Sequence, residues 1–143
     1  MKVRQISIFL ENRSGRLASV LREVGSAGVN IRALPLADTS DFGILRLIVD
    51  DVDKGVQALR ETGHTVSLTE VLAVEVPDHP GGLAGILDKL SAANLNVEYM
   101  YAFVCRATEK AVVVFRFEDV DHAVATLQSS GISVLRAETV YQL

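Results

Sequence analysis

Two short loops carry residue types that could bind a small charged molecule. One runs from Asn12 to Leu17 and the other from Asp78 to Leu83, and each places a glycine directly before a predicted helix. A glycine lets a ligand approach the backbone closely, and the first free N–H groups of a helix favour an anion such as a carboxylate. The side-chain oxygen of Asn12 or Asp78 could accept a hydrogen bond from an ammonium group. Together these features suit a zwitterion.

The same loops allow a purely structural interpretation. Asn12 and Asp78 belong to the residue types that cap helices, and the glycines could do no more than turn the chain. His79 lies within the second loop, where it could donate a hydrogen bond to a carboxylate or be an exposed loop histidine. The loops alone leave these alternatives open.

The sequence gives little support to metal binding, nucleotide binding or catalysis. The three histidines, His64, His79 and His122, stand in different contexts without metal-ligand spacing. The sequence contains no Gly-Lys-Ser/Thr motif of a nucleotide loop. It shows neither a pairing of nucleophile and base nor an acid/base dyad. We therefore expect no metal site, no cofactor and no enzymatic activity.

The two loops lie in two copies of one sequence unit. ENRSGRLASVLREVGSAGVNI, which begins at Glu11, reappears as PDHPGGLAGILDKLSAANLNV from Pro77, 66 positions later. A second segment, DDVDKGVQALRETGHTV, reappears as EDVDHAVATLQSSGISV after 68 positions. The two extra residues fall between these segments, most simply in a loop near Cys105. We predict one domain at 1–70 and a second at 71–143.

Each copy has the pattern strand, helix, strand, strand, helix, strand. The first helix of each copy has apolar residues at i, i+3, i+4 and i+7, typical of an amphipathic helix. Pro35 predicts an edge strand or a bulge, and Ile132 to Val140 is predicted to be the closing strand of the second copy. The pattern predicts an α+β fold of two ferredoxin-like βαββαβ units. Each has a four-stranded antiparallel sheet with its helices on one face. Because Thr65 to Val76 contains no linker, we expect the units to pack as an intramolecular pair.

Composition and charge indicate which partners and which cellular compartment to expect. The net charge of −4 argues against a nucleic-acid partner. The apolar runs are too short to span a membrane, and no signal peptide is evident. The single cysteine cannot form an internal disulfide, so we expect a cytoplasmic protein. The apolar content of 49% indicates further buried surface, and we expect a homodimer.

The motifs DHPGGLAGILDKLSAANLNVEYMY and ENRSGRLASVLREVGSAGVNIRAL resemble the opening of ACT domains, small regulatory modules with the pattern D/N-x-P-G-x-L, a helix, and then G/N-[IV]-N-[IV]. One copy covers each half, so the chain resembles a stand-alone tandem ACT protein. The resemblance implies an amino-acid ligand held at interfaces between paired units. The implied ligand-binding residues are Asn12, Arg13, Ser14, Gly15, Arg16, Leu17, Asn30, Ile31, Asp78, His79, Pro80, Gly81, Gly82, Leu83, Asn96 and Val97.

In that arrangement the loop of one unit faces the start of the second strand of its neighbour. The first copy departs from the family pattern, because Asn12 replaces Asp and Ser14 stands where proline is usual. We expect this change to weaken the preset loop shape, which makes the second copy the stronger candidate.

The resemblance indicates a non-catalytic sensor whose ligand stabilises one arrangement of units or subunits, with a separate enzyme or regulator responding to that change. The alternative is a regulatory subunit that docks on an amino-acid biosynthetic enzyme, such as an acetolactate synthase, with or without its own ligand.

Overall fold

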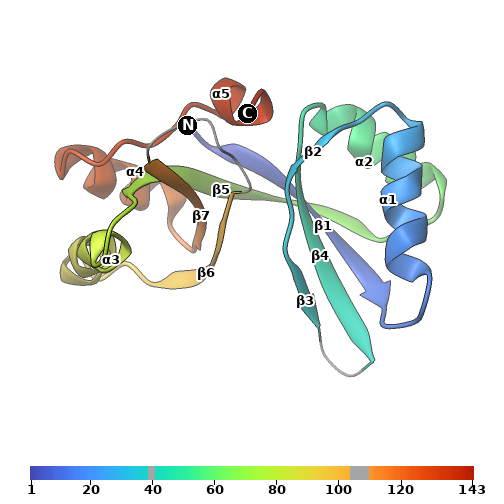
Figure 1. The fold of residues 1–143 in the computed structure, drawn as a ribbon, viewed down its shortest axis with the longest axis horizontal. Helices are drawn as coiled ribbons and strands as arrows, with labels where there is room; N and C mark the ends of the chain where they lie inside the picture. The colour runs from blue at the N-terminus through green and yellow to red at the C-terminus, as the bar shows by residue number, and fades with distance from the viewer. Residues whose placement is uncertain (39–40, 104–109) are drawn as a thin grey trace. The chain divides into compact units, whose positions relative to one another are not determined.

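The computed structural model describes residues 1–38, 41–103 and 110–143, so Cys105 and the predicted insertion near it lie outside the described residues. The chain divides into two compact units, which Figure 1 shows with their elements labelled. The first unit consists of Arg4–Thr69 and Gln142. The second unit consists of Met1–Val3, Glu70–Tyr141 and Leu143.

The first unit has the predicted α+β architecture. Its elements are β1 (Val3–Glu11), α1 (Arg16–Ser26), β2 (Ile31–Ala33), β3 (Leu36–Asp38), β4 (Phe42–Val49), α2 (Val52–Glu61) and the start of β5 (Val66–Pro77). β4 pairs antiparallel with β1, β2 and β3, and β1 lies between β4 and β5. Figure 1 shows α1 and α2 side by side on one side of the strands.

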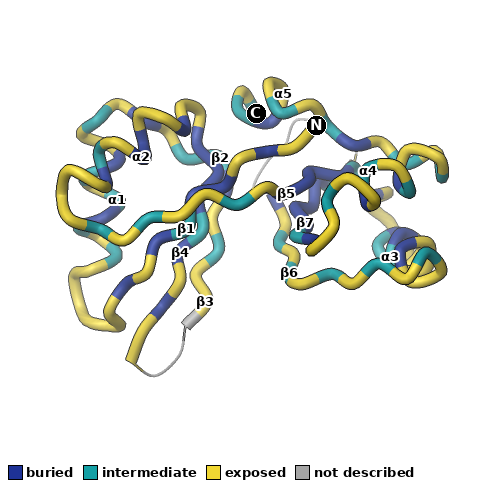
Figure 2. Tube along the Cα trace, turned by 180° about the vertical axis from the view of Figure 1, so that it is seen from behind, coloured by how far each residue is buried: buried dark blue, intermediate teal, exposed yellow. Residues whose placement is uncertain are grey.

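Alternation along β1 explains the position of this unit's core. Ile6 and Ile8 are fully buried, whereas Phe9 is 53% exposed. Figure 2 shows buried and exposed stretches alternating along β1. A Cβ added to Gly55 of α2 would lie 3.2 Å from Ile6 Cδ1, which identifies the Ile6 side of the sheet as the side that the helices cover.

The prediction for Pro35 is confirmed. The extended segment is interrupted there, so that β2 ends at Ala33 and β3 begins at Leu36. The pairing of β2 with β4 shifts register between Ile31 and Ala33. The Pro35 carbonyl accepts a hydrogen bond from the Arg46 N–H at 3.1 Å. Proline, which has no N–H to donate, is thus placed at a break in an outer strand.

The second unit repeats this plan. Its elements are β5, α3 (Gly82–Ala92), β6 (Val97–Ala102), β7 (Lys110–Phe117), α4 (Val120–Ser129) and α5 (Ala137–Tyr141). β7 pairs antiparallel with both β5 and β6. Leu72 and Phe115 pair across β5 and β7 and are fully buried in a cluster that also contains Leu90 of α3 and Leu127 of α4. Each amphipathic helix therefore covers its own sheet, as the spacing predicts.

The predicted closing strand of the second unit, Ile132 to Val140, is wrong beyond Leu135. Val134 forms an isolated antiparallel bridge with Val74, and the Leu135 N–H donates to the Ala73 carbonyl at 2.8 Å. The chain then forms α5 instead of continuing along β5. Within α5 it is Val140 that is buried, so the segment has one inward apolar residue rather than the alternation of a strand. A short pairing therefore occupies the fourth strand position.

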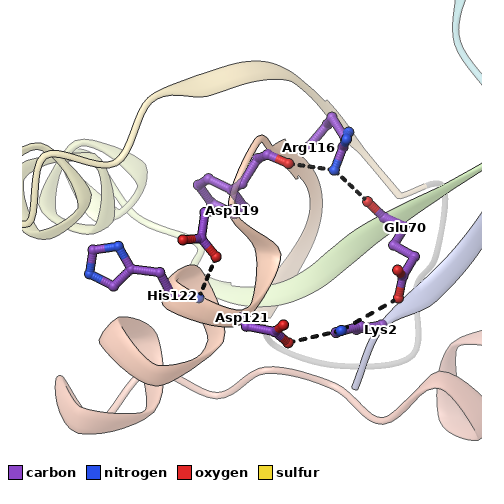
Figure 3. A network of polar contacts seen from close by, with 7 residues as sticks. Lys2, Glu70, Arg116, Asp119, Asp121 and His122 are labelled. Carbon is purple, nitrogen blue, oxygen red and sulfur yellow. Dashed lines mark hydrogen bonds and ion pairs between the residues drawn. The ribbon is translucent and has the colours of Figure 1, made fainter.

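Residues 1–3 contact the second unit. Lys2 Nζ lies 2.8 Å from Asp121 Oδ1 of α4 and 3.8 Å from Glu70 Oε2 of β5 (Figure 3). The Arg116 guanidinium donates to the Glu70 carbonyl at 3.2 Å. The hydrogen bond and charge of Asp121, with a smaller contribution from Glu70, raise the pKa of the Lys2 ammonium. These contacts connect the chain start to β5 and α4.

Candidate functional site

The two glycine loops have the same backbone conformation. Gly15 has φ 86° and ψ −13°, and Gly81 has φ 84° and ψ −5°, which is the left-handed region that glycine occupies without steric cost. Each glycine carbonyl accepts the first intrahelical hydrogen bond, from Ser19 N–H in the first unit and from Gly85 N–H in the second, at 3.0 Å in both. The duplication therefore extends from sequence to backbone geometry.

Ser14 leaves the shape of the first loop unchanged. The Arg16 N–H donates to the Arg13 carbonyl at 3.2 Å, and the Gly82 N–H donates to the His79 carbonyl at 3.0 Å. These two hydrogen bonds connect equivalent positions of the repeat. The turn thus forms with either serine or proline before its glycine.

The interpretation of Asn12 and Asp78 as helix caps is wrong. Gly15 and Gly81 are the N-cap residues of α1 and α3, and neither helix has a side-chain cap. The second helices of the repeat differ in this respect, because Asp51 and Asp119 both cap with their carboxylates. Figure 3 shows the Asp119 cap, whose carboxylate accepts from the His122 N–H at 3.0 Å. Asp78 is exposed at the surface.

The second loop borders a pocket of about 390 Å³ in the second unit. Three predicted residues, His79, Gly81 and Gly82, contribute to its lining. The complete lining is Glu75, Pro77, His79, Gly81, Gly82, Gly85, Ile86, Lys89, Lys110, Gly131, Ile132 and Ser133. Predicted residues Asp78, Pro80 and Leu83 belong to the same loop but lie outside this lining. We call this cavity the α3 pocket.

Two glycines on α3 line the α3 pocket. Gly82, Gly85 and Lys89 recur at i, i+3 and i+7, and so share one helix face. A Cβ on Gly85 would meet no described atom within 4 Å. A Cβ on Gly82 would lie 2.1 Å from the Pro77 carbonyl oxygen, so the backbone there tolerates only glycine. At these two positions the helix therefore borders the pocket with its backbone alone.

The charged residues of the α3 pocket come from three elements. Lys110 Nζ, at the start of β7, lies 3.5 Å from Glu75 Oε2 of β5. Lys89 Nζ of α3 donates to the Ser130 carbonyl at 3.3 Å. With two ammonium groups and one carboxylate, the lining excluding His79 carries one net positive charge in a chain whose net charge is −4. His79 Nδ1 lies 3.0 Å from the Pro80 carbonyl oxygen.

The equivalent positions of the first unit carry different side chains. Phe9 and Phe42 stand where the second unit has Glu75 and Lys110, and their rings stack with centroids 4.9 Å apart. The strand register supports this equivalence, because Phe42 pairs with Glu11 as Lys110 pairs with Pro77. An aromatic contact therefore replaces an ion pair.

The position of Lys89 also carries a different side chain in the first unit. Glu23 occupies the position of Lys89, and its Oε2 lies 2.8 Å from His64 Nε2 and 2.9 Å from Thr62 Oγ1. The cavity at the first loop, lined by Leu10, Glu11, Asn12, Arg13, Leu17, Leu36 and Gly43, measures about 70 Å³. Predicted residues Ser14, Gly15 and Arg16 are absent from that lining. The large pocket thus belongs to the second copy.

The predicted second-strand residues lie apart from the loops of their own units. Asn96 and Val97 line a separate hollow of about 320 Å³ beside the C-terminal end of α3. Because α3 has 11 residues and a helix rises about 1.5 Å per residue, the loop and Asn96 lie at opposite ends of it. In the first unit, the Asn30 N–H donates to Asp50 Oδ1 at 2.9 Å, and Ile31 pairs with Val49. A joint site of loop and second strand stays a prediction.

Sequence reasoning missed most of the α3 pocket. The additional lining residues are Glu75, Pro77, Gly85, Ile86, Lys89, Lys110, Gly131, Ile132 and Ser133. The signal that could have found some of them is the difference between the two copies. Where the first copy has Arg16, Ser19 and Glu23, the second has Gly82, Gly85 and Lys89 on the corresponding helix face.

No group of three or more His, Cys, Asp and Glu residues within 1–38, 41–103 and 110–143 could hold a metal ion. Over the same ranges, no helix is long and apolar enough to cross a lipid bilayer.

Residues 1–142 match the model of the family described as an ACT domain pair. The chain therefore belongs to the ACT domain pair family, whose domains are regulatory modules.

Solved structures with the same fold include protein BT0572 from Bacteroides thetaiotaomicron, which is 40% identical, with a TM-score of 0.94 over 100% of this chain and 98% of that one. The ligand-free regulatory subunit of aspartate kinase from Thermus thermophilus is 17% identical, with a TM-score of 0.65 over 90% of each chain. The corresponding subunit from Thermus flavus is 15% identical, with a TM-score of 0.64 and the same coverage. No curated protein matches.

Proposed function

We propose that this chain is a non-catalytic sensor that binds a free amino acid in the α3 pocket. The observation that carries the proposal is the contrast between the two copies. One glycine loop borders a pocket of about 390 Å³, and its duplicate borders a cavity of about 70 Å³. Membership in a family of regulatory modules supports a binding role.

The chemistry of the lining suits an amino acid. The volume lies within the range of about 300–1,000 Å³ typical of small-molecule sites. Lys110 offers an ammonium group to the ligand carboxylate, and Glu75 offers a carboxylate to the ligand ammonium. The positive end of the α3 dipole lies at Gly81 and Gly82 and favours the same orientation.

Binding would act as a signal by stabilising one conformation of the protein. A ligand shifts an equilibrium only to the extent that it binds one state better than the other. Here the lining includes Gly131 to Ser133, the segment that leads into the short pairing of Ser133 to Leu135 with β5. A ligand that contacts both α3 and this segment would hold them together. Binding at an interface with a neighbouring unit, homodimerisation and an enzyme partner stay predictions.

A thermal-shift screen against the twenty amino acids, followed by calorimetry, tests the proposal. A bound amino acid at 100 times its Kd would stabilise the protein by about 2.7 kcal/mol. Gly85→Leu places a side chain in open space within the α3 pocket and should abolish the response. Ser19→Leu makes the matched change in the first unit and should leave the response intact.

Melting of both variants without ligand verifies that they fold. The proposal fails if no amino acid stabilises the protein, or if Gly85→Leu responds as the unmodified chain does.

A further inference from the structure

We propose that the α3 pocket selects an acidic amino acid, one whose side chain carries a second carboxylate, such as L-aspartate or L-glutamate. This inference rests on the proposed function and deepens it by assigning the class of ligand. Its basis is the set of three charged side chains in the pocket lining, Glu75, Lys89 and Lys110.

One part of the pocket presents two adjacent opposite charges. Glu75 Oε2 and Lys110 Nζ lie 3.5 Å apart on neighbouring strands. The ammonium and carboxylate of an α-amino acid are likewise adjacent and opposite, so they complement this pair. All α-amino acids share that arrangement, so the Glu75–Lys110 pair does not discriminate between their side chains.

Lys89 is the residue that we expect to distinguish acidic amino acids from the others. It lies on α3, a separate element from the two strands, and its ammonium group is not a member of the Glu75–Lys110 ion pair. One of its three N–H donors reaches the Ser130 carbonyl, at 3.3 Å, and the others can reach a ligand. Once Lys110 and Glu75 pair with the α-carboxylate and the ammonium, Lys89 leaves one positive charge for the ligand side chain. A second carboxylate matches it, and an amide or an alkyl group does not.

Apolar residues also line the α3 pocket. Ile86 of α3, Pro77 of β5 and Ile132 are part of the pocket lining. Their side chains suit the methylene groups that separate the two carboxylates of an acidic amino acid. A ligand with charges at both ends and a short apolar middle therefore fits the pattern of the lining.

The first unit shows that this charge pattern is specific to the second. At the position of Lys89 the first unit has the opposite charge, Glu23, which already contacts His64 and Thr62. At the positions of the charged pair it has two phenylalanines. The first copy of the repeat therefore folds without these charges at the equivalent positions.

Calorimetry with matched ligand pairs tests the inference. We expect L-glutamate to bind at least about tenfold more tightly than L-glutamine, or L-aspartate than L-asparagine, which corresponds to about 1.4 kcal/mol. Because Lys89 and Lys110 are exposed, this preference should shrink as salt is raised. Glutarate and succinate, which lack the ammonium, should bind more weakly than the corresponding amino acids.

Variants assign the preference to one side chain. Lys89→Gln should make the acidic ligand and its amide bind alike, and Lys89→Arg should restore the difference. Glu75→Gln should weaken both ligands by the same factor. Glu23→Gln, the matched change in the first unit, should alter neither affinity.

The outcomes separate the two proposals. Binding of neutral amino acids as tightly as acidic ones overturns this inference and leaves the proposed function standing. Binding of no amino acid overturns both. A preference for the acidic ligand that persists in folded Lys89→Gln protein also overturns the assignment, since the charge would then be recognised elsewhere.

Discussion

The two units share a loop and differ in what surrounds it. Gly15 and Gly81 have nearly the same φ and ψ, and each accepts the first hydrogen bond of its helix. Around the first loop, Phe9 stacks on Phe42. Around the second, the same positions carry charges beside a cavity more than five times larger.

The glycine motif specifies a turn and does not by itself specify a pocket. The turn is retained in both copies because only a left-handed residue connects the strand to its helix there. The pocket depends on side chains that the motif does not include, on the face of the helix and on the neighbouring strands. Changes to the turn should therefore affect both units alike, and changes to the pocket should affect one.

The largest effect should come from Gly82→Ala. The new Cβ would lie 2.1 Å from the Pro77 carbonyl oxygen, so the helix or the strand must shift. We expect the free energy of unfolding to fall by about 1–3 kcal/mol in urea denaturation. Arg16→Ala, the matched change, already has a Cβ and loses only exposed contacts, so it should cost less than about 1 kcal/mol. Equal losses for the two variants would contradict the difference between the units.

Gly15→Ala and Gly81→Ala should each destabilise by about 1–2 kcal/mol, because alanine in the left-handed region is strained. No described atom lies within 4 Å of either added Cβ, so strain is the only cost. The same denaturation experiment measures both. Losses that differ by more than 1 kcal/mol would show that the loops are not energetically equivalent.

Gly85→Ala should raise stability by about 0.5–1 kcal/mol, because alanine replaces glycine inside a helix where its methyl group meets open space. The gain would be read from the shift in the urea midpoint. A loss of stability would mean that the α3 pocket is narrower than the structure has it. The matched Ser19→Ala change should produce a smaller gain, since serine is already a better helix former than glycine.

The smallest effect concerns Lys2. A raised pKa in the folded protein means that Lys2 contributes stability below its usual value of 10.5, and that this contribution disappears as pH rises through the raised pKa. Stability of the unmodified chain should therefore fall more steeply above about pH 10.5 than that of Lys2→Gln. Denaturation series at pH 9 to 12 measure both slopes, and parallel curves would rule out the contribution.

Much of the fold was predictable because it depends on local patterns. The repeat, the apolar helix stripes and the break at Pro35 all leave marks within a few residues. The closing segment of the second unit was not, because Ile132 to Leu135 is too short for its alternation to be distinguished from the α5 sequence that follows.

The candidate site was harder to predict for a related reason. Its loop residues form one motif, and Gly81 and Gly82 of that motif border a cavity, whereas their role in ligand binding stays a prediction. Lys110 and Ser133 are far from that motif in the chain, and only strand pairing brings them near it. No pattern in the neighbouring sequence marks a charged residue at such a position as part of a site. An alignment of the two copies would have marked some of these positions, because a glycine or lysine in one copy stands opposite a bulky or acidic residue in the other.

β5 runs without interruption from Val66 to Pro77, with Thr69 in one unit and Glu70 in the other. Any recombination between relatives that joins halves at this boundary would cut through a strand and mix its pairing partners. Chimeras intended to exchange binding specificity should therefore inherit β5 whole, with their crossover at Gly63 or beyond Pro77.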